Sequence, residues 1–70
     1  MTLAKSLLLQ GAEFLKNEKW EEALQKFEEA LKEYPDLPTT HYYLGVTWEH
    51  KGEHQKALSA YRKALDLKPD

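Results

Sequence analysis

An internal repeat constrains the fold of this chain more than any other feature of its sequence. When each residue is compared with the one 34 places later, seven of the 33 pairs that begin at residues 4–36 are identical. Random composition would give about two. The identities fall mostly on small and apolar residues: Gly11/Gly45, Ala23/Ala57, Leu24/Leu58, Ala30/Ala64, Leu31/Leu65, Pro35/Pro69 and Asp36/Asp70. The chain is therefore predicted to be a single domain, 1–70, with two copies of one supersecondary unit at residues 4–37 and 38–70.

Apolar residues within each copy recur every three or four places, as they do on one side of an amphipathic α-helix. The clearest stripes are Trp20, Ala23, Leu24, Phe27, Ala30, Leu31 and Tyr34 in the first copy, and Ala57, Leu58, Tyr61, Ala64 and Leu65 in the second. The pattern predicts an all-α fold of four helices, at about Leu3–Lys16, Glu18–Tyr34, Leu37–Lys51 and Glu53–Lys68. Short connections make neighbouring helices antiparallel, so that they form two helix-turn-helix hairpins.

Residues between the predicted helices fit turns and helix ends. Pro35 and Pro69 end the second and fourth helices, because proline disfavours helical geometry in the residue before it. Asn17 and Gly52 are expected to form the turns inside the hairpins, since both tolerate positive φ. Asp36 is the expected N-cap of the third helix.

With these spacings the two copies resemble the tetratricopeptide repeat. That family has a period of 34 residues and the pattern W-x2-L-G-x2-Y, then A-x3-F, then P. The first copy reads Leu7-x2-Gln10-Gly11-x2-Phe14, Ala23-x3-Phe27 and Pro35, and the second reads His41-x2-Leu44-Gly45-x2-Trp48, Ala57-x3-Tyr61 and Pro69. Leu7, Gln10 and His41 depart from the family's residues, and His41 is predicted to be a partly buried packing residue. The resemblance implies two hairpins stacked as a short right-handed α-solenoid, and leaves open that the chain is a segment of a longer repeat protein.

The small and large residues of the pattern are predicted to have packing roles. Gly11 and Gly45 would let the two helices of each hairpin approach closely, because glycine has no side chain at the contact. Four large aromatic side chains are expected to fill the space between the hairpins: Phe14, Phe27, Trp48 and Tyr61. None of these residues is assigned a direct functional role.

In the tetratricopeptide family the first helix of each hairpin lines a concave groove that holds an extended peptide or a partner helix. The resemblance therefore implies a partner groove lined by Lys5, Leu8, Ala12 and Leu15 from the first hairpin and by Thr39, Tyr42, Val46 and Glu49 from the second. Some members clamp a terminal carboxylate with Lys, Asn and Arg, but Leu8, Ala12 and Tyr43 occupy three of those places here. The predicted function is a protein-interaction module with a scaffold or adaptor role, without such a clamp.

The first predicted helix is apolar on more than one side, and two explanations stay open. Either a partner covers Leu8 and Leu15, or these side chains pack against the second hairpin. Self-association is the alternative function, because Tyr61 and Leu65 would meet the next hairpin of a longer array and otherwise form an uncovered face for a homodimer. The first copy has eight acids and five lysines and the second has four acids and five bases, which favours head-to-tail contact. A two-fold contact closes more simply.

Composition argues against several other classes of function. The chain has no cysteine, which excludes disulfides and thiolate zinc sites. Charged residues make up 31% of the chain but both signs are interspersed and the net charge is −2, so no footprint for nucleic acid is present. No apolar run approaches the roughly 18 residues that a membrane span requires, and the short leucine run at Leu7–Leu9 does not fit a signal peptide. A cytoplasmic location is predicted.

Residues that could carry catalysis or metal binding are sparse. His50 and His54 are the one candidate metal pair, but Gly52 between them is expected to end the helix and break the required spacing. The serines and threonines lie in no nucleophile-elbow or phosphate-loop context. We therefore predict a protein that is not an enzyme and that binds no metal or cofactor.

Overall fold

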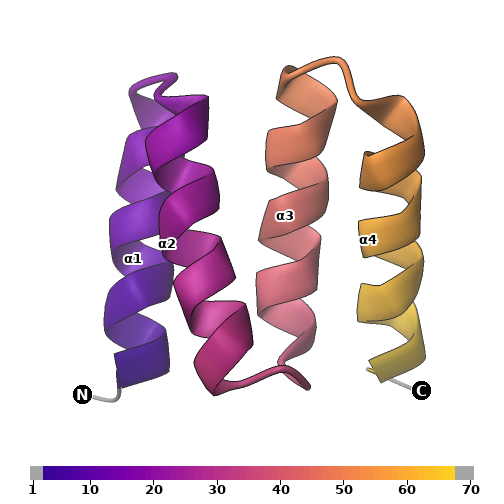
Figure 1. Ribbon diagram of the computed structural model, residues 1–70, viewed down its shortest axis with the longest axis horizontal. Coiled ribbons are helices and arrows are strands. Elements are labelled where there is room, and N and C mark those ends of the chain that lie inside the picture. The colour runs from indigo at the N-terminus through magenta and orange to yellow at the C-terminus, as the bar shows by residue number, and fades with distance from the viewer. Residues whose placement is uncertain (1–2, 68–70) are drawn as a thin grey trace.

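The computed structural model describes residues 3–67, and these residues form four α-helices and no strand. The helices are α1 (Leu3–Lys16), α2 (Trp20–Glu33), α3 (Pro38–His50) and α4 (His54–Leu67), which run antiparallel to their neighbours (Figure 1). The all-α fold of two stacked hairpins is confirmed. The second helix begins at Trp20, two residues later than predicted, and the predicted end at Lys68 with its stop at Pro69 lies outside the described residues.

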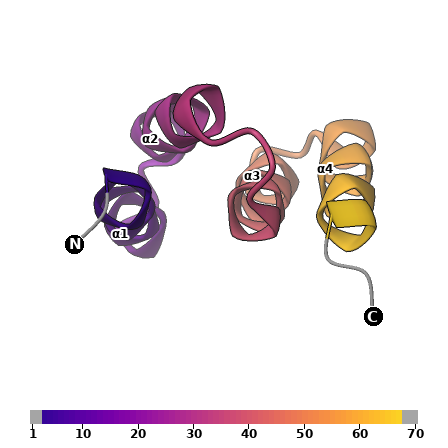
Figure 2. The same cartoon turned by 90° about the horizontal axis from the view of Figure 1, so that it is seen from below.

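The helices follow one another in a staggered row, which makes the molecule a flat slab of 32 × 31 × 18 Å. Seen along the helix axes, α2 lies above the gap between α1 and α3 (Figure 2). Each helix packs against the next, and α1 also contacts α3. As a result α2 and α3 form the internal junction between the hairpins, whereas α1 and α4 each have one side without a neighbouring helix.

Each hairpin is closed by an aromatic ring that lies over a glycine. A Cβ atom added to Gly45 would stand 2.7 Å from the ring of Tyr61, and one added to Gly11 would meet the ring of Phe27 more closely still. Both distances are shorter than carbon atoms tolerate, so a side chain at either position would have to displace the ring that lies over it. The predicted packing role of both glycines is confirmed.

The turns inside the hairpins are two copies of the Schellman helix ending. The backbone N–H of Lys19 donates to the Phe14 carbonyl at 2.8 Å, and that of Glu53 donates to the Trp48 carbonyl at 2.9 Å. The left-handed residue of this ending is Glu18, with φ of 60°, in the first turn and Gly52, with φ of 81°, in the second. The prediction of positive φ is thus right for Gly52 and wrong for Asn17, because the left-handed position is the residue after the helix cap.

The start of α3 is fixed by a histidine instead of an aspartate. The N-cap residue is Leu37, not Asp36, and no side chain caps the helix. Pro38 occupies the first turn, where a backbone N–H would have no acceptor within the helix, so the N–H that proline lacks is not needed. The buried His41 places Nε2 3.0 Å from the carbonyl oxygen of Pro35, and since a carbonyl only accepts, Nε2 carries the proton and donates. The predicted packing role of His41 is confirmed, and its bond ties α3 to the connecting loop.

The core lies at the internal junction. Ala23, Leu24 and Phe27 of α2 pack against Leu44 of α3, and the Phe27 ring stacks on Tyr43 with a centroid distance of 5.1 Å. The other expected aromatic residues, Phe14 and Trp48, pack around this cluster while staying partly exposed. Across residues 3–67 no helix is both long and apolar enough to cross a bilayer.

Candidate functional site

The predicted groove residues lie on α1 and α3 and differ in exposure. Lys5, Thr39, Tyr42 and Glu49 are exposed, whereas Leu8, Ala12, Leu15 and Val46 are half-buried. Leu8 and Leu15 both pack against the core cluster of α2 and α3 residues, so internal packing accounts for part of the apolar surface of α1. Three of the four exposed residues therefore lie near the start of α1 or α3, and Glu49 lies near the end of α3.

A hollow of about 300 Å³ lies between the first turns of α1 and α3. Its lining residues are Ala4, Lys5, Leu8, Leu9, Leu37, Thr39 and Tyr43. Three of them, Lys5, Leu8 and Thr39, belong to the predicted groove, and the structure brings them together. Sequence reasoning missed Leu9, Leu37 and Tyr43; the run Leu7–Leu9 was the available signal, because three adjacent leucines cannot all face one side of a helix.

A second hollow, of about 340 Å³, lies between α3 and α4 and is lined by Pro38, Thr39, Tyr42, Ala64 and Leu65. It joins the predicted groove, through Thr39 and Tyr42, to the predicted self-association face, through Leu65. Sequence spacing did not show this adjacency, since it depends on how closely α4 packs on α3. One surface therefore runs from α1 across α3 to the edge of α4.

Aromatic rings line this surface along α3. Tyr42 contacts Tyr43 edge-on at 6.1 Å between ring centroids and approaches Tyr61 at 5.8 Å. Tyr42 is 54% exposed, so about half of this large ring faces solvent. An exposed aromatic ring between two apolar hollows is typical of a contact point for another polypeptide.

Tyr61 is held inside its own hairpin and is only partly exposed. Its hydroxyl donates to a carboxylate oxygen of Glu49 at 2.8 Å, while its ring covers Gly45. Desolvation by burial, together with the hydrogen bond to Glu49 and the charge of that carboxylate, raises the pKa of Tyr61 to about 12. Of the two residues predicted to form a self-association face, Leu65 is therefore the freely exposed one.

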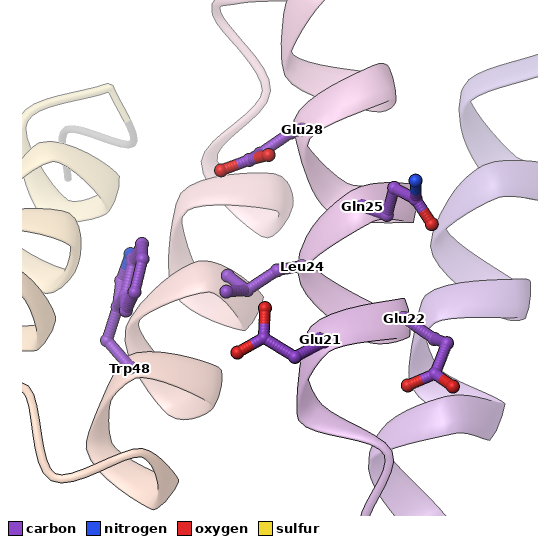
Figure 3. A pocket seen from close by; sticks show the side chains of 6 residues that line it. All are labelled: Glu21, Glu22, Leu24, Gln25, Glu28 and Trp48. Atoms are coloured by element: carbon purple, nitrogen blue, oxygen red, sulfur yellow. The ribbon is translucent and has the colours of Figure 1, made fainter.

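A further hollow, between α2 and α3, was not predicted from the sequence. It is lined by Glu21, Glu22, Leu24, Gln25, Glu28 and Trp48. Glu21, Leu24 and Glu28 extend from α2 on the side that faces Trp48 (Figure 3). The chain's own cations already engage this hollow: Lys51 forms an ion pair with Glu21, and Lys56 Nζ stands 4.5 Å from the centre of the Trp48 ring.

The candidate metal pair of His50 and His54 is separated by the turn between α3 and α4. His50 belongs to α3, where its ring stacks on Trp20 at 4.6 Å, and His54 begins α4. Within residues 3–67 no group of three or more histidine, aspartate or glutamate side chains is placed to hold a metal ion.

Comparison with known protein families agrees with this architecture. The sequence profile described as tetratricopeptide repeat matches residues 8–70. The chain belongs to the tetratricopeptide repeat family. Proteins of this family are built from the helical hairpins described above, and their general role is to bind other proteins.

One relative of this tetratricopeptide protein is named as a probable biofilm formation methyltransferase, WspC, of Pseudomonas putida. It is 41% identical to the present chain over 49 residues. That match covers 70% of this chain but only 12% of the relative. The likeness is therefore confined to a small part of the larger protein.

Proposed function

We propose that this tetratricopeptide protein binds a segment of another polypeptide on the surface formed by α1 and α3, in a scaffold or adaptor role. The observation that carries the proposal is the apolar hollow between these helices, which lies beside the exposed ring of Tyr42. An apolar side chain of the partner would fill the hollow. Tyr42 would cover the neighbouring part of the bound segment, and Thr39 offers a hydroxyl to its backbone.

The lining of the hollow also indicates which chemistry the partner presents. Leu8 and Tyr43 occupy positions where some family members carry polar residues that clamp a carboxylate, and both line the hollow. Recognition would therefore depend on an apolar anchor residue in the partner instead of a free terminal carboxylate.

Affinity capture followed by mass spectrometry would identify the partner, and calorimetry on the purified pair would then test the site. We expect Tyr42→Ala to weaken binding by about tenfold or more, with little change in the thermal midpoint because Tyr42 is mostly exposed. Leu58→Ala is the matched control, since Leu58 is equally exposed, at 55%, but lies on α4 away from the hollow. A partner bound equally well by wild type and Tyr42→Ala would refute the proposed site.

We further propose that this chain itself does not catalyse methyl transfer. The name of the relative describes a methyltransferase, but only 12% of that protein matches, and the matching part of this chain lies within its helical repeats. Titration with a methyl donor would then release no heat of binding. Measurable binding would contradict the proposal.

Self-association is a second candidate function, favoured by the side of α4 that has no neighbouring helix. Leu65 is 73% exposed, which is the largest exposed fraction among the large apolar side chains of residues 3–67. With Leu58 it forms an apolar pair two helical turns long.

A cytoplasmic location, the absence of nucleic-acid and membrane partners, and membership of a longer repeat protein stay predictions.

A further inference from the structure

The repeat register makes it possible to compare the outer helices with the inner ones. A shift of 34 residues places α4 on α2 and α1 on α3, and α2 and α3 form the internal junction. Residues of α2 that contact α3 therefore show which residues of α4 a further helix would cover. Likewise, residues of α3 that contact α2 show which residues of α1 would become buried if another copy stacked in front of it.

The outer face of α4 keeps the apolar character of the internal junction. Leu24 is 6% exposed at the junction, and its equivalent on α4, Leu58, is 55% exposed. Leu31 packs against the core cluster, and its equivalent is Leu65. The α4 surface thus carries the same side chains that pack into the core one repeat earlier, and we name Leu58 and Leu65 the α4 face.

The outer face of α1 is less apolar: Leu9, the equivalent of Tyr43, is an exposed leucine, but polar residues stand at other junction positions. Thr40, Leu44 and Thr47 of α3 are buried, and Leu44 packs in the core cluster with residues of α2. Their equivalents on α1 are Ser6, Gln10 and Glu13. Gln10 and Glu13 are exposed, and the amide of Gln10 donates to the hydroxyl of Ser6 at 3.4 Å. A copy stacked head to tail would bring the Glu13 carboxylate and the Gln10 amide to positions where the junction has Thr47 and Leu44, so its apolar contact with α4 would be smaller than the contact at the junction.

We infer that two copies of this chain associate through their α4 faces about a two-fold axis, and not head to tail. The inference rests on the self-association proposed above and adds the surface and the symmetry. A two-fold contact sets the same patch of both copies against itself, so it needs only one apolar face per chain. With the two α4 helices antiparallel, Leu58 of one copy lies beside Leu65 of the other.

The charges on α4 are compatible with this arrangement. Arg62 lies between the two leucines along the helix and shares a shallow hollow with Leu58. In an antiparallel pair Arg62 is within reach of Asp66 on the second copy, and an ion pair at the edge of the contact offsets repulsion between the two arginines.

Dimerisation through the α4 face would also affect the proposed groove. Leu65 and Tyr42 both line the hollow between α3 and α4, so a second copy would cover that hollow and the part of the groove beside Tyr42. The hollow between α1 and α3 contains no α4 residue and stays open in both copies. The dimer would thus present two equivalent binding surfaces for apolar anchors.

Sedimentation equilibrium of the full chain, over micromolar to high micromolar concentrations, tests the inference. We expect wild type to form dimers and Leu65→Glu to raise the dissociation constant by about tenfold or more. Leu9→Glu is the matched control, because it makes the same change at a leucine of α1 that is 53% exposed. It should leave dimerisation unchanged. Circular dichroism melting checks that each variant is folded, and Leu58→Glu replaces Leu65→Glu if the latter is not.

The possible outcomes separate the inference from the proposals on which it rests. Equal loss of association in Leu65→Glu and Leu9→Glu would establish head-to-tail stacking and overturn the two-fold contact, while self-association stands. Wild type that stays monomeric throughout would overturn both. The binding test with Tyr42→Ala is read separately on the captured partner, so either result leaves the groove proposal to its own experiment.

Discussion

The two hairpins have the same backbone arrangement, but their equivalent aromatic residues have different surroundings. In each, a ring covers a glycine and a Schellman ending closes the turn. Phe27 is fully buried and stacked on Tyr43, whereas Tyr61 is partly exposed and contacts Tyr42 at the surface. The difference arises because, within residues 3–67, α2 has helices on both sides and α4 packs on α3 alone. The same residue pattern thus forms a core or a surface according to its neighbours.

The largest expected effect comes from removing the two equivalent rings. Phe27→Ala should lower the free energy of unfolding by about 3–5 kcal/mol, because it leaves a cavity at the junction between the hairpins. Tyr61→Ala should cost clearly less, since water can enter the space that its ring leaves. Urea denaturation of both variants measures the difference. Equal losses would show that the second hairpin is packed as tightly as the first.

Adding a methyl group beneath each ring should give a smaller contrast. In Gly11→Ala the new Cβ atom meets the buried Phe27 ring, and overpacking of this kind costs about 1–3 kcal/mol. In Gly45→Ala the Tyr61 ring can move outward, and the gain in helix propensity of about 1 kcal/mol offsets the strain. Thermal melts should therefore show a destabilised Gly11→Ala and a nearly unchanged Gly45→Ala. The reverse order would contradict the difference in packing.

The two turns inside the hairpins offer a third comparison, in which the two substitutions should change stability in opposite directions. Glu18 holds a left-handed conformation that costs a side chain roughly 1 kcal/mol, so Glu18→Gly should stabilise the protein by about that amount. Gly52→Ala should destabilise it to a similar degree, since the same strain is introduced there. Asn17→Gly serves as the control and should bring no gain, because the residue before the left-handed position needs no glycine. Chemical denaturation midpoints decide.

The smallest expected effect is a dependence on alkaline pH that arises from Tyr61 in the second hairpin. The folded pKa of Tyr61 is raised from 10.0 to about 12, so between these values the unfolded chain releases a proton that the folded chain retains. The stability contributed by Tyr61 is fully present below pH 10 and is lost as pH rises through its folded pKa. Tyr61→Phe should make stability fall less steeply above pH 10. Identical slopes in wild type and variant would remove Tyr61 as the cause.

Much of the fold could be predicted because its signals are local. Periodicity places the four helices within two residues at each described end, and the glycines at Gly11 and Gly45 were identified from their spacing alone. The turn at Glu18 was misplaced because its left-handed residue is not one that favours that conformation, so composition pointed to the neighbouring Asn17. Asp36 was expected to cap α3 for a similar reason, whereas the helix begins one residue later.

The candidate site was predicted only in part. Lys5, Leu8 and Thr39 meet in one hollow as the register suggests, but Leu9, Leu37 and Tyr43 complete it from positions outside the expected stripe. Whether these residues line the hollow depends on the angle at which α1 and α3 pack, and the spacing of residues within one helix does not indicate that angle.

The sequence by itself determined the helices, their order, the repeat register and the family, because these follow from residue spacing and from the few residues that close contacts tolerate. Only the tertiary structure decided which of two equivalent residues is buried. Leu24 and Leu58 have identical chemistry and equivalent positions, and Leu58 is exposed solely because no helix of residues 3–67 lies beyond α4. Burial is a property of neighbours in space, and apolar surface becomes core or contact face according to what packs on it.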